Sequence, residues 1–201
     1  MNTVLFRNDA RSVLLSALLG VMSGLLVIAL SFVTTEDSLL PYFSLSTFSV
    51  WFFACSLIAL LSDDNGTAGR HTAVYVLCLI TVPCIISFFK CVLERDDPIR
   101  YLQREVIWYL LIAVIAVVLC YALAFVLNFG RMHNVLGVIL RLLPAVFIAI
   151  DEESCIRIVL TYHRHIATTV MQGLCLIGYL VILVILHFKK PAEMYRWKSV
   201  S

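Results

Sequence analysis

The chain has 201 residues, of which 62% are apolar and only 14% charged, and its mean hydropathy is +0.98. This composition lies outside the range of soluble globular proteins and indicates a membrane protein. The formal net charge is +2. Because the basic residues are spread over several loops rather than gathered in one block, nucleic acid is not an expected partner.

The first apolar run covers residues 12–33 and follows Arg7 and Arg11. An acidic Thr-Glu-Asp stretch comes after it, where a secretory signal would carry a small-residue cleavage site. We therefore interpret the run as a retained transmembrane helix.

Small residues recur at every fourth position along this first run, at Ser12, Ser16, Gly20 and Gly24. In lipid, a line of small side chains lets two helix backbones approach closely. The pattern predicts that this face packs against another helix. We expect that helix to belong to the same chain, with a partner subunit or a second copy as the alternative.

Five further apolar runs follow, at about 45–61, 71–93, 106–127, 135–150 and 166–188. A hydrocarbon core about 30 Å thick requires roughly 20 residues at a rise of 1.5 Å each, so the second and fifth runs are short. The sequence predicts an all-α, polytopic integral membrane bundle. We expect about six transmembrane helices, or five if one short run does not span, in a single transmembrane domain over residues 1–201.

A polar turn enters the third run in the sequence GTAGRHTAVYVLC, residues 66–78. A catalytic cysteine needs a histidine within about 3 Å to accept its proton. Seven positions on one straight helix separate His71 from Cys78 by about 10.5 Å along the axis. The pair therefore requires His71 to lie in a loop that folds back; otherwise His71 sits at the headgroup level and Cys78 packs within the helix.

The spacing of Gly69, His71 and Cys78 resembles the motif of the accessory gene regulator B family, small polytopic membrane endopeptidases that process quorum-sensing peptides. The resemblance implies that His71 is the general base and Cys78 the nucleophile.

The fifth run contains Arg141 and Pro144 and is closed by Asp151, Glu152 and Glu153. Ionisable groups at membrane depth need a partner or water. Ten residues of straight helix separate Arg141 from Asp151 by about 15 Å, so they pair only if the helix breaks at Pro144. We expect a ligand-binding site formed by Arg141 with Asp151 or Glu152, and an anionic substrate or an acidic group on another helix is an equally good partner for Arg141. The alternative is a short helix whose arginine reaches the surface.

The seven cysteines lie mostly inside the apolar runs, and no two are spaced as C-x-x-C. This distribution is typical of small apolar packing residues. Neither a metal site nor a cofactor is predicted.

Two resemblances concern the whole chain. Six helices with a small-residue line on the first resemble the substrate-binding S components of energy-coupling factor transporters, which implies docking of that helix to a membrane coupling subunit. The order of LPYFSLSTFSVWFF, a polar turn and VILRLLPAVFIAIDEE resembles uncharacterised bacterial six-helix membrane proteins.

The likeliest role from the sequence is small-molecule binding or transport, as one subunit of a transport system in the cell membrane. An intramembrane cysteine endopeptidase is the first alternative, and a non-catalytic membrane assembly subunit is the second. Lys189 and Lys190 after the last run favour cytoplasmic N- and C-termini. The basic loop 90–104 would then be external, which conflicts with the rule that basic loops face the cytoplasm.

Overall fold

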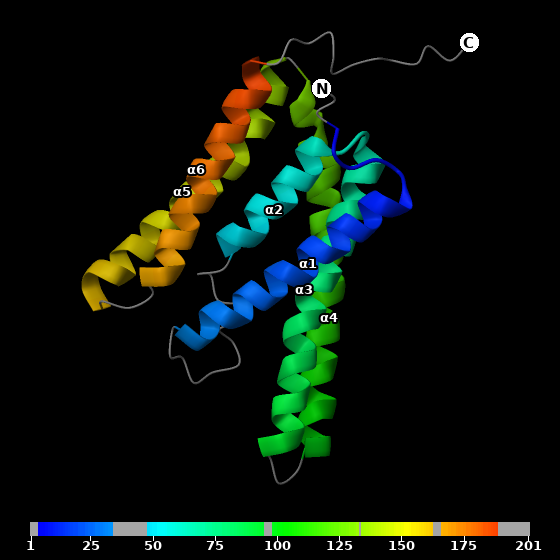
Figure 1. Cartoon of the computed structure of the whole chain (residues 1–201), viewed down its shortest axis with the longest axis vertical. Helices are drawn as coiled ribbons and strands as arrows, with labels where there is room; N and C mark the ends of the chain where they lie inside the picture. The colour runs from blue at the N-terminus through cyan, green and yellow to red at the C-terminus, as the bar shows by residue number, and fades with distance from the viewer. Residues whose placement is uncertain (1–3, 34–47, 95–97, 133, 163–165, 189–201) are drawn as a thin grey trace.

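The computed structural model of the chain describes residues 4–33, 48–94, 98–132, 134–162 and 166–188. These residues form six α-helices and one 3-10 helix, shown in Figure 1. In chain order they are α1 (Ala10–Val33), α2 (Phe48–Leu61), α3 (Asn65–Glu94), α4 (Pro98–Leu127), η3 (Asn128–Arg131), α5 (Val135–Tyr162) and α6 (Ile166–Phe188). The all-α prediction is therefore confirmed.

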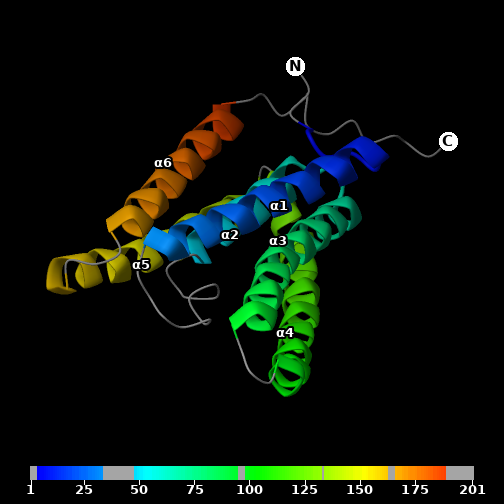
Figure 2. The ribbon, with the colours of Figure 1, turned by 60° about the horizontal axis from the view of Figure 1, so that its bottom comes forward.

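The helices form two hairpins that diverge from a common end, with α1 and α2 between them (Figure 1). Helix α3 lies beside α4, and α5 lies beside α6, as a second view also shows (Figure 2). The short helix α2 contacts α3, α4, α5 and α6. Helix α2 is therefore the element that joins the two hairpins.

Four helical stretches are long and apolar enough to cross a membrane: Ala10–Ala29, Asn65–Ile86, Ile107–Arg131 and Thr169–Leu186. In the described part of α4, residues 107–127, most side chains are apolar and exposed, as at Ile107, Val114 and Val118. An exposed apolar surface of this kind suits contact with lipid tails. The chain is therefore a membrane protein by the length and composition of its helices.

Helix α2 has 14 residues, which at 1.5 Å each span about 21 Å, less than the roughly 30 Å of a hydrocarbon core. The predicted residues 45–47 of this run lie outside the described residues. Helices α1 and α6 agree with their predicted ranges to within two residues. Helices α3 and α4 begin earlier than predicted, at Asn65 and Pro98, because a helix can continue with polar residues beyond its apolar part.

The predicted range 135–150 for the fifth helix is wrong at its C-terminal end. Helix α5 runs without interruption to Tyr162, and Pro144 lies buried inside it. The acidic stretch after Ile150 continues the helix rather than closing it, because glutamate and arginine are good helix formers. A proline costs a helix one backbone hydrogen bond, yet α5 continues through Pro144 without a break.

The small residues of α1 lie against α3. A Cβ on Gly20 would overlap the carbonyl oxygen of Tyr75 and lie 2.8 Å from the Cβ of Cys78. On the next turn, a Cβ on Gly24 would lie 2.9 Å from both Leu79 O and the Cβ of Val82. Glycine is required at both positions because the backbones of α1 and α3 approach so closely, and within the described structure this face of α1 is covered by the same chain.

The start of α3 is fixed by Asp64. Its carboxylate accepts hydrogen bonds from the Thr67 amide at 2.9 Å and from the Thr67 hydroxyl at 2.7 Å. Partial burial opposes ionisation of Asp64, but the hydrogen bonds from Thr67 outweigh it and lower the pKa of Asp64 below its usual 3.8. This cap sets the first turn of α3, on which the position of His71 depends.

Replacing Gly20 by alanine should destabilise the fold, because the added Cβ would push α1 away from the backbone of α3. Overpacking of this kind costs about 1–3 kcal/mol. Thermal unfolding of the purified protein in lipid nanodiscs measures the loss.

The matched control is Gly178→Ala on α6, where a Cβ would meet Phe53 at an ordinary distance of 3.6 Å. Gly178→Ala should leave the melting temperature unchanged or raise it. Equal melting temperatures for the wild type and Gly20→Ala would contradict the close contact of α1 with α3.

Candidate functional site

Three helices bring polar side chains together around Asp151 in the middle of α5. The Asp151 Oδ2 atom accepts a hydrogen bond from the Ser49 hydroxyl on α2 and another, of 3.0 Å, from the Gln172 amide on α6. Ser49 and Gln172 are both fully buried. Gln172 lies near the start of the candidate span Thr169–Leu186, so this cluster adjoins a helix that is apolar enough to cross a membrane.

Glu152 follows Asp151 and faces α6. Its Oε1 atom lies 3.4 Å from the position that a Cβ on Gly173 would occupy. Its Oε2 atom is buried and has no hydrogen-bond partner. A buried polar atom without a partner is costly in any protein interior, and more so for a carboxylate at membrane depth. Within the described structure, the side chain of Glu152 is therefore incompletely satisfied.

The backbone explains how these residues meet. Ser49 lies in the first described turn of α2, and its hydroxyl reaches Asp151 on α5. On α6, the absence of a side chain at Gly173 leaves room for the carboxylate of Glu152.

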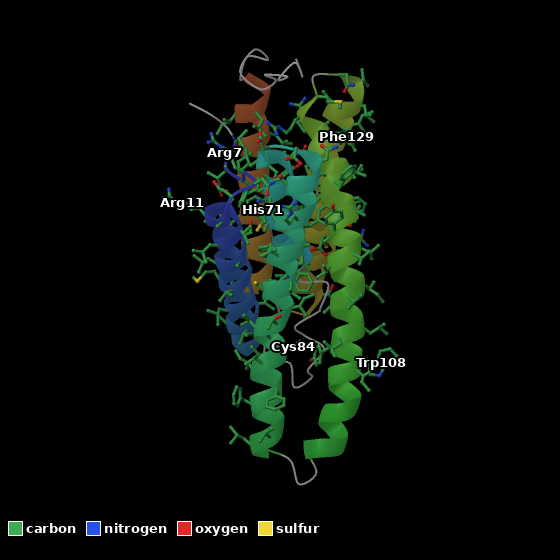
Figure 3. The ribbon with its side chains drawn as sticks, turned by 90° about the vertical axis from the view of Figure 1, so that its right-hand side faces the viewer. Arg7, Arg11, His71, Cys84, Trp108 and Phe129 are labelled. Carbon is green, nitrogen blue, oxygen red and sulfur yellow. The ribbon has the colours of Figure 1, made fainter. Side chains whose placement is uncertain are left out.

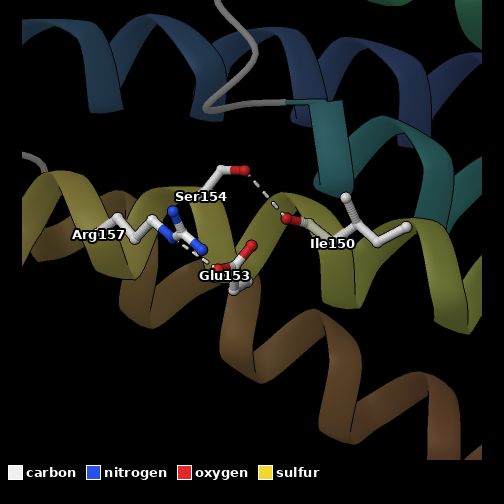
Figure 4. Close-up of polar contacts among 4 residues, drawn as sticks. All are labelled: Ile150, Glu153, Ser154 and Arg157. Carbon is white, nitrogen blue, oxygen red and sulfur yellow. Dashed lines mark hydrogen bonds and ion pairs between the residues drawn. The ribbon is translucent and has the colours of Figure 1, made fainter.

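The charge of these two carboxylates is not neutralised within the described part of the chain. The nearest basic residue along α5 is Arg157, which is exposed and pairs with Glu153 at 2.6 Å (Figure 4). In the same close-up, the Ser154 hydroxyl donates to Ile150 O. Among the described residues, neither Asp151 nor Glu152 is within ion-pair distance of a basic side chain.

The structure does not bring Arg141 together with Asp151 or Glu152. Arg141 is buried and reaches back along α5, where it donates to Gly137 O at 3.2 Å and to Met132 O at 3.1 Å. The unbroken helix keeps Arg141 about 15 Å from Asp151. The guanidinium therefore binds the turn before α5, and the polar site consists of the two carboxylates without it.

His71 lies inside α3 rather than in a loop, and its side chain is buried. Its Nε2 atom lies 3.0 Å from Arg7 O, and its Nδ1 atom lies 3.1 Å from the Ser16 hydroxyl. Because a carbonyl only accepts hydrogen bonds, Nε2 must carry the proton. The imidazole also packs against Phe6. His71 thus connects α3 to α1 and to the segment before α1.

This segment is held by further hydrogen bonds. The Phe6 amide donates to Leu61 O at 3.2 Å, and the Asp63 amide donates to Phe6 O at 3.0 Å. Arg7 and His71 lie towards the same end of the helices (Figure 3). The N-terminal segment, residues 4–9, is therefore anchored to the turn between α2 and α3.

The structure does not bring His71 and Cys78 together. Both lie on the continuous helix α3, about 10.5 Å apart along its axis. Both ring nitrogens of His71 contact other groups, and Cys78 packs against Gly20 of α1. The loop that a catalytic pair requires is absent from this region, because α3 begins six residues before His71.

Two residues of the polar cluster, Ser49 and Gln172, were not among the predicted site residues. Gln172 is a lone amide within an apolar helix, and a polar side chain in such a helix is itself a signal of function. Ser49 belongs to a serine-rich stretch, and nothing in the sequence distinguishes it from its neighbours. In the described residues, no group of three or more His, Cys, Asp or Glu side chains could hold a metal ion.

Comparison of the chain with protein-family models, with characterised proteins and with solved structures finds no match. The site is therefore interpreted from its own geometry.

Replacing His71 by alanine should release the N-terminal segment, because two hydrogen bonds and the contact with Phe6 are lost. The cost should be about 2–4 kcal/mol. Hydrogen exchange of the Phe6 and Asp63 amides should become at least about tenfold faster. Thr81→Ala, at an exposed position of the same helix, is the control and should leave both amides protected. Unchanged protection in His71→Ala would contradict the anchoring role.

Cys78 should react with a thiol-alkylating reagent no faster than Cys84, which lies on the same helix and is similarly half-buried. The reason is that His71 lies out of hydrogen-bond reach of Cys78 and does not activate it. Mass spectrometry of the alkylated peptides at neutral pH gives both rates. A Cys78 rate tenfold above that of Cys84 would restore the peptidase hypothesis.

Proposed function

We propose that this protein binds a small molecule at the cluster of Ser49, Asp151, Glu152 and Gln172 and carries it across the membrane. The buried Oε2 atom of Glu152, which has no partner, is the observation that supports the proposal. A bound solute supplies the missing contact. Since both carboxylates lack a basic partner among the described residues, the solute is a small cation or a molecule that presents a charged amine.

The position of α2 supports a transport role. Helix α2 contacts both hairpins and contributes Ser49 to the cluster from its first turn. A helix end at membrane depth that faces an ionic group is a recurring feature of transporter binding sites. Movement of one hairpin relative to the other about α2 would alter the surroundings of the two carboxylates.

We also propose that all six helices cross the cell membrane and that both termini are cytoplasmic. An even number of crossings places the start of α1 and the end of α6 on one side. Exposed basic residues support a cytoplasmic assignment, since Arg7, Arg11 and Arg70 lie near the start of α1 or of α3. Crossing by α5 requires the polar cluster to be shielded from lipid, as its position between α2 and α6 provides.

A partner subunit that docks on α1 would use the exposed face of this helix, which carries Leu14, Leu18 and Met22. The small-residue face is already occupied by α3. A membrane assembly subunit without any ligand remains the competing function, and it predicts that neither carboxylate matters for binding.

The binding test uses purified protein in nanodiscs and a panel of alkali cations and small primary or quaternary amines. A cognate cation at about 100 times its Kd should stabilise the protein by about 2.7 kcal/mol. Glu152→Gln keeps the shape of the side chain and removes its charge, so it should abolish this stabilisation.

Glu153→Gln is the matched control, because Glu153 is the next residue and its carboxylate is exposed and paired with Arg157. This variant should retain the stabilisation. Uptake of the same cation into proteoliposomes should likewise be lost in Glu152→Gln and retained in Glu153→Gln. Equal stabilisation in both variants, or none with any member of the panel, would contradict the proposed site.

A further inference from the structure

A buried arginine near the start of α5 has no acidic partner in the described part of the chain. The side chain of Arg141 is only 6% exposed, and no described acidic side chain lies within ion-pair distance of its guanidinium. Its Nε and Nη2 atoms donate to two carbonyl oxygens. Carbonyl oxygens solvate a positive charge without neutralising it, and a buried charge without a counter-charge is costly.

The contacts of Arg141 leave part of the guanidinium available. A guanidinium has five N–H donors, and two of them bind Gly137 O and Met132 O, which leaves three. The Nη1 atom makes no hydrogen bond to a described residue and, unlike the Oε2 atom of Glu152, it is not enclosed. A ligand can therefore reach Nη1 without displacing the hydrogen bonds that hold the turn before α5.

Neighbouring elements fix the position of this guanidinium. A Cβ on Gly130 would lie 3.2 Å from the Cγ of Arg141, so the stem of the arginine packs on the backbone of η3. The Tyr179 hydroxyl on α6 donates to Arg141 O at 3.0 Å. Asn128 connects η3 to the end of α2 by donating to Ala59 O at 2.6 Å. A donor that is held in place before the ligand arrives loses little conformational entropy on binding.

The same turn lies at the end of a membrane-crossing segment. The candidate span Ile107–Arg131 ends one residue before Met132, whose carbonyl oxygen binds Arg141. Phe129 in this turn lies towards the same end of the helices as Arg7 (Figure 3). In a bilayer, the guanidinium therefore lies at the level of the lipid headgroups, where phosphate groups are concentrated.

We propose that Arg141 forms a binding site for a phosphate group, supplied by the headgroup of an anionic phospholipid or by phosphate in solution. A guanidinium suits phosphate because its planar N–H donors match the spacing of the phosphate oxygens. The phosphate accepts hydrogen bonds at Nη1, neutralises the buried charge and leaves the contacts with the turn in place. This site is distinct from the carboxylate cluster, because the unbroken helix α5 separates Arg141 from Asp151 by about 15 Å.

The experiment measures the melting temperature of the full chain in dodecyl maltoside, an uncharged detergent without phosphate, in Tris chloride buffer. Sodium phosphate is compared with sodium chloride of equal ionic strength, and phosphatidylglycerol is compared with an uncharged galactolipid. Either phosphate ligand at about ten times its Kd should raise the melting temperature by roughly 3–6 °C. Stabilisation by both ligands shows that free phosphate is sufficient, and stabilisation by phosphatidylglycerol alone identifies the lipid headgroup as the source.

Two substitutions of Arg141 test the role of its side chain. Arg141→Gln should abolish the stabilisation, whereas Arg141→Lys, which keeps the charge but loses the planar donors, should reduce it. The matched control is Arg157→Gln, because Arg157 is an exposed arginine of the same helix that pairs with Glu153. This control should retain the full stabilisation.

A measurement on the wild type covers the case in which neither Arg141 variant folds. Butanedione modifies guanidinium groups, and peptide mass spectrometry gives its rate at each arginine. Phosphate or phosphatidylglycerol at about ten times its Kd should slow the modification of Arg141 about tenfold and leave that of Arg157 unchanged.

Three results would each overturn the proposal: no rise in melting temperature above the controls, full stabilisation in Arg141→Gln, or equal modification of Arg141 with and without ligand. Glu152→Gln should keep the stabilisation by phosphate, so the phosphate site and the cation site fail separately.

Discussion

The close contact between α1 and α3 is the constraint on which the rest of the structure depends. In a bilayer, lipid tails are as apolar as leucine, so two helices gain little by burying apolar side chains against each other. Gly20 and Gly24 provide an alternative, because they let the backbone of α1 approach Leu79 O and Tyr75 O directly. The imidazole of His71 secures the same two helices at one end through Ser16 and Arg7. With α1 and the N-terminal segment fixed on one side, α3 presents Tyr75 to α2 and α4 in the core.

The ionisable groups are compensated in different ways, and the differences distinguish structural from functional residues. Arg141 donates to two carbonyl oxygens near the start of α5, so its charge stabilises a turn. Glu153 pairs with Arg157 on an exposed face. Asp151 receives hydrogen bonds from two neutral side chains, whereas Glu152 keeps a buried oxygen without a partner. Among these four described ionisable groups, Glu152 keeps a buried oxygen without a hydrogen-bond partner, and the proposed binding site therefore lies there.

Much of the fold follows from hydropathy, because a helix that crosses the hydrocarbon core needs about 20 consecutive apolar residues. The ranges of α1 and α6 are predicted to within two residues, and the all-α class is predicted outright. The predicted helix boundaries are wrong where polar residues continue a helix. Residues 65–70 are predicted as a polar turn but belong to α3. The acidic residues after Ile150 are predicted to close the fifth run, but they continue α5. Hydropathy shows whether a segment suits lipid, whereas helix formation also depends on caps such as Asp64. Asp151 and Glu152 of the candidate site were singled out from the sequence as acidic residues at the end of an apolar run, whereas Ser49 and Gln172 were not.

By itself, the sequence determined that this chain enters a membrane as helices, that α1 carries a face of small residues, and that carboxylates interrupt an apolar stretch. These properties are local, because hydropathy and spacing act within one helix. Only the tertiary structure decided that Gly20 meets α3, that His71 binds α1 rather than Cys78, and that Arg141 turns away from Asp151. It also placed Ser49 and Gln172 beside Asp151. Each of these contacts depends on how separate helices pack and on the direction in which a side chain leaves its helix. The spacing of residues within a single helix determines neither.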